Sequence, residues 1–238
     1  MTLTFPGESA EYRRARDQLL DDEIELRRAM ERVAVARRAL PLGGAVPEDY
    51  EFVGADGRVR LSELFDGHRS LAIYHWMFPR HAGDDRPAPP SGPLARWPLE
   101  ETPCPSCTAL LDQLDGAAAH VAQNMSLVVV AGVEFAPMAV VAEDRGWRNL
   151  RLVSSAGNTF RRDYHGDGEH GPDPMLNVFT RAGDGTVRHS WSSELLFAPT
   201  DPGQDPRHVG TLEPLWNLFD LTPEGRPDGW EEQLSYDP

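Results

Sequence analysis

Two apolar segments flank an amphipathic one in the middle of this chain. Residues 71–78 and 126–132 are apolar at nearly every position, which is typical of central strands covered on both faces. Between them, residues 107–121 carry apolar side chains at helical spacing, and residues 150–154 predict a third strand. A strand, a helix and a strand in this order predict a parallel crossover unit. The expected fold class is therefore α/β.

The rest of the chain predicts shorter elements around this unit. Residues 50–64 and 175–191 each contain a Gly-rich turn between apolar runs, so each predicts an antiparallel hairpin. Residues 8–40 place apolar side chains on one face among many charges, which predicts a long surface helix. Short helices are expected at residues 137–145 and 215–219, the latter before a Pro- and Gly-rich tail.

We expect one main domain with an appendage at each end. Residues 1–46 form the N-terminal helical arm, residues 47–210 the main domain, and residues 211–238 a helix and tail that pack on it. Within the main domain, the Pro- and Gly-rich residues 79–103 form a loop insertion without regular structure. A loop of this length is either a lid over a site or an unstructured insertion.

Charge and composition exclude several classes of partner. The 238 residues include 38 acidic and 23 basic side chains, a formal net charge of -15, which disfavours nucleic acid and anionic membrane surfaces. No segment approaches the ~20 apolar residues of a membrane span, and the first residues lack the apolar core of a signal peptide. We expect a cytoplasmic protein, and the exposed N-terminal helix makes a homodimer a possible assembly.

The chemistry of the chain centres on its two cysteines, which form the motif Cys104-Pro105-Ser106-Cys107 at the start of the predicted helix. Thiols one helical turn apart exchange readily with a disulfide, and a helix start stabilises a thiolate. We predict that Cys104 is exposed and attacks the substrate, with a pKa lowered from ~8.5. Cys107 falls on the buried stripe and is the predicted resolving thiol.

Other chemistry is open to the same residues. A zinc site would use the cysteines with His75, His81 or His120, but the second closely spaced ligand pair of a structural site is missing, so no metal is expected. His75 is either a neighbour of the thiolate or a hydrogen-bonded core histidine. A third alternative is a scaffold with passive cysteines, in which aromatic residues such as Trp76 line a binding pocket.

The element order, with CxxC between a strand and a helix and a proline directly before a hairpin, is similar to that of thioredoxin-like proteins. The resemblance is closest to an uncharacterised thioredoxin-like family of predicted dithiol-disulfide oxidoreductases, and it covers most of the chain. The stretches that carry it are residues 38–41, 49–52, 71–78, 104–107, 146–147, 153–155 and 220–226.

This resemblance implies a three-layer α/β/α sandwich with a mixed central sheet and a thiol-disulfide oxidoreductase activity without a cofactor. The implied partner is a disulfide-containing protein or a small-molecule thiol or disulfide. Pro174 is the candidate for a cis-proline that faces the cysteine pair and binds substrate, and we place Trp76 and His75 beside it.

Two alternatives to this activity remain: a thioredoxin-fold binding protein with non-catalytic cysteines, and a thiol-dependent peroxidase. Peroxiredoxins carry a threonine three residues before the reactive cysteine, where this chain has Glu101, and this counts against peroxide chemistry. The long loop at residues 79–103 also departs from the commoner pattern of the resembled family, and it affects access to the site.

Overall fold

The computed structural model describes residues 3–169, 171–203, 213–222, 224 and 227–236, and it divides into two compact units, Met1–Gly43 and Gly44–Pro238. Unit 1 contains helix α1 (Ala10–Arg38), close to the predicted 8–40. The Ser9 hydroxyl accepts a hydrogen bond from the Tyr12 N–H at 3.1 Å and caps its first turn. None of the α1 residues is buried, and its apolar side chains, such as Leu26 and Met30, are exposed.

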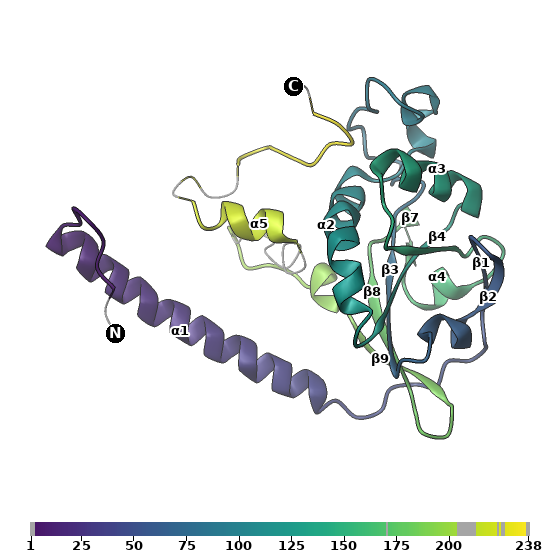
Figure 1. Ribbon diagram of the computed structural model, residues 1–238, viewed down its shortest axis with the longest axis horizontal. Helices are drawn as coiled ribbons and strands as arrows, with labels where there is room; N and C mark the ends of the chain where they lie inside the picture. Colours follow the sequence, from purple (N-terminus) through teal and green to yellow (C-terminus); the bar gives the residue numbers. More distant parts are fainter. Residues whose placement is uncertain (1–2, 170, 204–212, 223, 225–226, 237–238) are drawn as a thin grey trace. The chain divides into compact units, whose positions relative to one another are not determined.

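Unit 2 is built on a seven-stranded sheet in the order β2-β1-β5-β4-β3-β8-β9 (Figure 1). Its strands are β1 (Glu51–Gly54), β2 (Gly57–Arg60), β3 (Ser70–His75), β4 (Ser126–Ala131), β5 (Arg151–Ser154), β8 (Leu176–Arg181) and β9 (Val187–Ser192). The helices are α2 (Pro105–Val121), α3 (Phe135–Arg145), α4 (Phe160–Asp163) and α5 (Pro214–Phe219). A separate two-stranded sheet joins β6 (Asp167–Gly168) to β7 (Gly171–Pro172).

The large sheet is mixed. Strand β3 pairs in parallel with β4, and β4 with β5, because helices α2 and α3 return the chain to the same end of the sheet. Strand β8 is antiparallel to β3 on its other side and continues into β9, and β1 and β2 form a hairpin at the far edge. This arrangement confirms the predicted α/β class, the mixed central sheet and both hairpins.

Two buried clusters lie on the two faces of the sheet. Tyr74 and Trp76 belong to the cluster beneath α2 and α3, together with both cysteines. Leu71 and Ile73 belong to the opposite cluster, which α4 and the 3-10 helix Leu61–Phe65 cover. This alternation along β3 is the pleat of a strand that is buried on both faces, and it produces the three layers.

Several details differ from the predictions. Strand β3 ends at His75 and not at residue 78, although the Trp76 N–H still donates to the Val130 carbonyl at 2.8 Å. The loop at residues 79–103 contains two short 3-10 helices, Leu94–Arg96 and Leu99–Glu101, where no regular element was expected. Elements of two to four residues are too short for a periodic pattern, so α4, β6 and β7 were also missed.

Two segments near the C-terminus that the sequence analysis singled out lie partly outside the described residues. The stretch 220–226 falls partly outside the described residues, as does part of the predicted segment 211–238. Across the portions of the chain that the structure describes, no helix is both long and apolar enough to span a bilayer.

Gly116, an exposed position of α2, offers a test of local helix energetics. It lies inside α2, and a Cβ added there would meet no heavy atom within 4 Å. Because glycine loses more backbone entropy on folding than alanine, Gly116→Ala should raise the free energy of unfolding by about 0.5–1 kcal/mol. Urea denaturation checks this, and a decrease in stability would show that the position is under a constraint other than helix propensity.

Candidate active site

The backbone fixes the cysteine motif between β3 and α2. Cys104 is the N-cap of α2 and Pro105 its first residue, where the missing N–H of proline has no consequence. The Cys104 N–H donates to the Met77 carbonyl at 3.0 Å, which ties the motif to the end of β3. The Thr108 N–H and hydroxyl both donate to the Cys104 carbonyl, at 3.0 and 2.8 Å. The motif is therefore held from both sides.

Cys104 and Cys107 form no disulfide bond in this structure, and their thiols differ in acidity. A hydrogen bond from the Cys107 thiol lowers the pKa of Cys104 to about 7; burial opposes this shift, while the Cys107 N–H and the Arg86 guanidinium contribute to it. Burial raises the pKa of Cys107, and its hydrogen bond to Cys104 acts in the same direction. Cys104 is thus the sulfur that ionises first, as the motif predicted.

Tyr74 completes a chain of three polar atoms in the core. Its hydroxyl donates a hydrogen bond to the Cys107 sulfur, which favours the Cys107 thiolate. Burial raises the pKa of Tyr74 well above its usual value, and the charges of both cysteines act in the same direction. Tyr74 therefore remains a donor whenever Cys107 loses its proton.

Arg86 brings a positive charge to the Cys104 sulfur. Its Nη2 lies 3.6 Å from the Cys104 Sγ, and its Nη1 donates to the Ser106 hydroxyl at 2.7 Å. Asp84 orients the guanidinium through two hydrogen bonds, from Nε at 2.9 Å and from Nη2 at 2.7 Å. Such a bidentate pair fixes the plane of the guanidinium, so the charge is held toward Cys104.

Arg80 anchors the loop that carries Arg86. Its guanidinium is buried and donates to the Arg86 carbonyl at 2.6 Å and to the Pro103 carbonyl at 3.2 Å. The Asp84 carboxylate lies 3.6 Å from the same guanidinium. One side chain therefore joins the start of the loop, its middle and the residue before Cys104.

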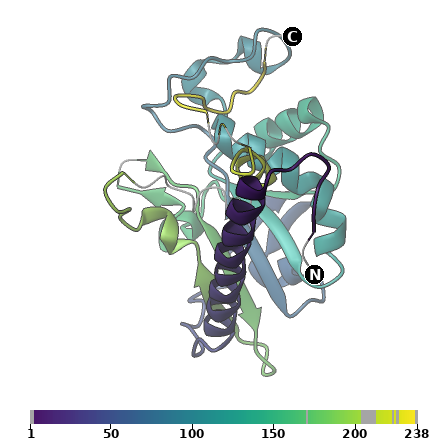
Figure 2. The ribbon, with the colours of Figure 1, turned by 90° about the vertical axis from the view of Figure 1, so that its left-hand side faces the viewer.

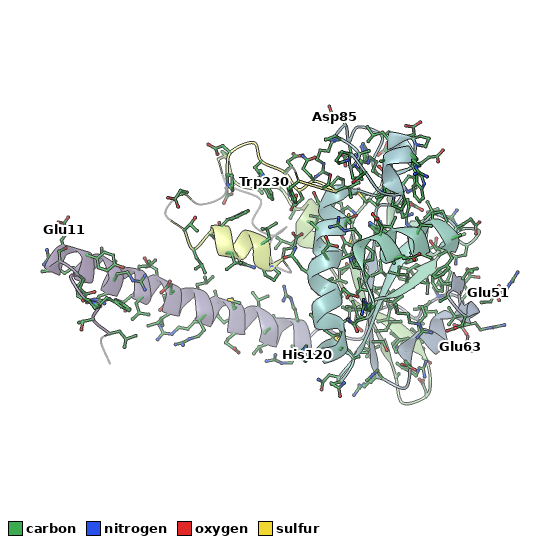
Figure 3. The ribbon with its side chains drawn as sticks, turned by 45° about the horizontal axis from the view of Figure 1, so that its top comes forward. Glu11, Glu51, Glu63, Asp85, His120 and Trp230 are labelled. Carbon is green, nitrogen blue, oxygen red and sulfur yellow. The ribbon has the colours of Figure 1, made fainter. Side chains whose placement is uncertain are left out.

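The C-terminal tail lies over the same end of α2. Leu234 is buried in the cluster that contains the cysteines, and its carbonyl accepts from Arg145 at 2.8 Å. Glu232 accepts from the Ser106 hydroxyl at 2.9 Å, and its own carbonyl accepts from Arg86 at 3.3 Å. In Figures 1 and 2 the loop, in blue, and the tail, in yellow, run side by side. Figure 3 shows Asp85 of the loop and Trp230 of the tail away from His120 at the far end of α2.

These two covers overturn the prediction that Cys104 is exposed. Cys104 is 1 % exposed and Cys107 2 % exposed. The predicted burial of Cys107 follows from the apolar stripe of α2, but the burial of Cys104 comes from the loop and the tail, which are distant in sequence. Of the two possibilities for residues 79–103, the structure shows an ordered cover over the cysteines.

His75 is not brought together with the cysteines. It follows Tyr74 in β3 and so lies on the opposite face, stacked on Phe160 with a centroid separation of 5.4 Å. The Asn177 amide donates to its Nε2 at 3.2 Å. Burial lowers its pKa to about 3, and the positive charge of Arg161 adds to this effect. Of the two alternatives for His75, the hydrogen-bonded core histidine is confirmed and the neighbour of the thiolate is not. A role of His75 in substrate binding remains a prediction.

Trp76 and Pro174 occupy different positions relative to the site. Trp76 lies in the cysteine cluster, packed on Phe78 at 4.8 Å and on Trp147 at 5.4 Å between ring centroids, with no exposed surface. Pro174 is partly buried two residues before β8. Among the described residues the cis peptide bond precedes Pro79 and not Pro174, so the expected cis conformation is corrected. A role of either residue in substrate binding remains a prediction.

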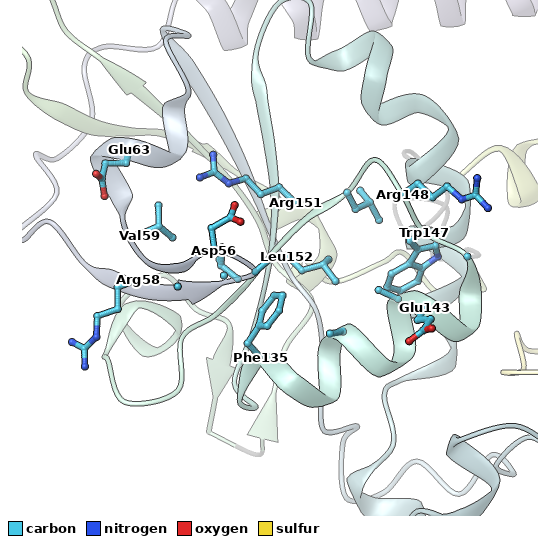
Figure 4. A pocket seen from close by; sticks show the side chains of 18 residues that line it. Asp56, Arg58, Val59, Glu63, Phe135, Glu143, Trp147, Arg148, Arg151 and Leu152 are labelled. Atoms are coloured by element: carbon cyan, nitrogen blue, oxygen red, sulfur yellow. The ribbon is translucent and has the colours of Figure 1, made fainter.

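The described residues form no cluster of three or more His, Cys, Asp or Glu side chains with the geometry to hold a metal ion. The zinc alternative therefore lacks a ligand set within that part of the chain. A cavity of about 830 Å³ lies at the other edge of the sheet, between β1, β2, β5 and α3 (Figure 4). Its lining includes Arg58, Phe135, Trp147 and Arg151 but neither cysteine, so it is separate from the cysteine motif.

The sequence was also compared with known families and structures. A family model described as "Bacterial protein of unknown function (DUF899)" matches residues 2–236, nearly the whole chain. The chain belongs to the DUF899 family. No curated protein matches the sequence.

Solved structures similar to this DUF899 chain include three thiol proteins or relatives of them. The exposed lipoprotein thioredoxin Etrx1 from Streptococcus pneumoniae is 14 % identical, with a TM-score of 0.40 over 69 % of this chain and 98 % of its own. A secreted Mycobacterium tuberculosis disulfide oxidoreductase homologous to E. coli DsbE is 13 % identical (TM-score 0.38; 69 % and 93 %). A peroxiredoxin-like protein from Aquifex aeolicus is 14 % identical (TM-score 0.37; 64 % and 75 %).

Three residues of the site were missed by the sequence reasoning. Tyr74 was recoverable, because alternation along β3 places it on the face of Trp76 and opposite His75. Arg86 and Glu232 carried no such signal. They lie among other charged residues of a Pro-rich loop and a polar tail, and only the folded chain brings them to the start of α2.

Proposed function

We propose that this DUF899 protein is a thiol-disulfide oxidoreductase that uses Cys104 and Cys107 as its redox pair. The observation that carries the proposal is the inequality of the two sulfurs: the pKa of Cys104 is lowered to about 7, and that of Cys107 is raised. At neutral pH this inequality supplies a thiolate nucleophile beside a protonated partner, the starting state of dithiol exchange.

The exchange follows in two balanced steps. The Cys104 thiolate attacks a substrate disulfide, so that a mixed disulfide forms and the first substrate thiolate leaves and takes a proton. Cys107 then loses its proton, with the hydroxyl of Tyr74 stabilising the new thiolate, and attacks the Cys104 sulfur. The second substrate thiolate leaves, the substrate has gained two electrons, and the protein holds a disulfide. A thiol reductant completes the cycle, as expected in the cytoplasmic compartment that we propose.

The cover over the site has a direct consequence for this chemistry. Because Cys104 is 1 % exposed, a disulfide reaches it only when the loop around Arg86 or the tail around Glu232 moves away. The substrate we propose is a disulfide-containing protein or a small-molecule disulfide that enters in this open state. Local opening of this kind costs less free energy than global unfolding.

The same burial favours a second candidate, a thioredoxin-fold binding protein with non-catalytic cysteines. Buried cysteines in a core are commonly inert, and packing alone explains their presence. The two candidates differ in whether Cys104 ionises near neutral pH and forms a reversible disulfide with Cys107.

Alkylation of the reduced protein separates the two candidates. The rate constant for modification of Cys104, followed by peptide mass spectrometry between pH 5 and 10, should rise with a midpoint near pH 7. Cys107 should remain unmodified at neutral pH because its pKa is raised. Incubation in glutathione redox buffers should convert the pair reversibly to a disulfide. A midpoint near that of an ordinary thiol, ~8.5, together with no disulfide would support the binding protein instead.

A further inference from the structure

Glu232 is a buried carboxylate at the start of α2, where the cysteine motif lies. It belongs to the tail, is 3 % exposed and sits at the N-terminal end of the 17-residue helix α2. Its Oε2 accepts from the Ser106 hydroxyl at 2.9 Å and lies 4.0 Å from the Arg86 Nη1. Its Oε1 is buried with no hydrogen-bond partner among the described residues. Burying a carboxylate costs free energy unless both oxygens accept hydrogen bonds. One oxygen of this carboxylate lacks a donor, so its burial is only partly compensated.

The surroundings of Glu232 have the properties of an anion site. The positive end of the α2 dipole favours negative charge, and a guanidinium and a hydroxyl supply directional donors. Ser106 links the two, since its Oγ accepts from Arg86 at 2.7 Å and donates to Glu232. These donors come from the loop and from α2, whereas the carboxylate comes from the separate C-terminal tail.

The same guanidinium also reaches the reactive sulfur. The Arg86 Nη2 lies 3.6 Å from the Cys104 Sγ, while its Nη1 faces Ser106 and the tail. A small molecule with a carboxylate a few bonds from a sulfur atom would present both groups at once, the sulfur to Cys104 and the carboxylate to Ser106 and Arg86. Glu232 offers only the carboxylate half of this pair.

We propose that Glu232 occupies a carboxylate subsite of the substrate, and that carboxylate-bearing small disulfides displace it to reach Cys104. The tail then acts as an internal competitor that keeps the dithiol covered until such a substrate binds. This inference rests on the proposed function and names its substrate class. It predicts a preference for anionic disulfides in spite of the formal net charge of -15 of the chain.

The test compares two disulfide probes on the full-length reduced protein. The probes are 3,3'-dithiodipropionate, which carries two carboxylates, and bis(2-hydroxyethyl) disulfide, which is neutral. For each probe, the rate of Cys104 oxidation is divided by the rate at which free reduced glutathione reacts with the same probe. Glu232→Gln should raise the ratio of anionic to neutral rates by about tenfold, because it removes the competing charge. Ser106→Ala in the Glu232→Gln background should abolish most of that gain. Asp228→Asn is the matched control, since this residue of the same tail is exposed and should leave the ratio unchanged.

A binding measurement separates failure of the subsite from failure of the redox function. In Cys104→Ser/Glu232→Gln no exchange occurs, and calorimetry should detect dithiodipropionate but not the neutral probe. Binding of dithiodipropionate with no exchange in the parent protein would keep the subsite and overturn the oxidoreductase. Exchange with an unchanged rate ratio, and no selective binding in the double variant, would overturn the subsite and leave the oxidoreductase standing.

Discussion

Cys104→Ser removes disulfide exchange, with the rate of reduction of a small disulfide expected to fall about a thousandfold or more. The reason is that Cys104 is the sulfur with the lowered pKa, and the remaining thiol of Cys107 has a raised pKa at the same site. Serine preserves the shape of the buried position, so the melting temperature should change little. The measurement is the initial rate with bis(2-hydroxyethyl) disulfide under a coupled thiol assay.

The matched variant is Cys107→Ser, and it should behave differently. Attack by Cys104 still takes place, but no second thiol is present to release the product, so the mixed disulfide accumulates and mass spectrometry detects one adduct per chain. Equal losses in both variants, with an adduct in neither, would exclude the assignment of Cys104 as nucleophile. An adduct on Cys107 in the Cys104→Ser variant, formed at the same rate, would reverse the two roles.

Gly166→Ala is expected to destabilise the protein by about 3 kcal/mol, which corresponds to a melting temperature lower by roughly 6–12 °C. A Cβ at this position would lie 1.7 Å from the Nδ1 of His75. The ring cannot move away, since it is fully buried, stacked on Phe160 and hydrogen-bonded to Asn177. The backbone is also held, because the Gly166 N–H donates to the Arg161 carbonyl at 2.6 Å.

Gly183→Ala is the control for this prediction, because a Cβ there would meet no heavy atom within 4 Å. Chemical denaturation of both variants should show a loss for Gly166→Ala alone. If the two variants were equally stable, the close approach of the Gly166 backbone to His75 would not exist in solution. Since His75 and the cysteines lie on opposite faces, the pH midpoint for alkylation of Cys104 should remain the same in Gly166→Ala.

Much of the fold was predictable because its signals are local. The parallel crossover depends on three local segments. These are the strand-length apolar runs at residues 71–78 and 126–132 and the amphipathic helix between them. The cysteine motif likewise marks the start of α2, where Pro105 suits the first turn. The choice between the two alternatives for His75 was also local, since neighbours in a strand point to opposite faces.

Some features of the site follow from the sequence alone, and others follow only from the tertiary structure. By itself the sequence determined the α/β class, the pair of thiols at a helix start and the burial of Cys107, because these depend on periodicity and on contacts within one helical turn. Only the tertiary structure decided that Cys104 is covered and that Arg86 and Glu232 meet beside it. These contacts join residues 18 to 146 positions apart, and no local pattern encodes which distant loop or tail closes over a given helix end.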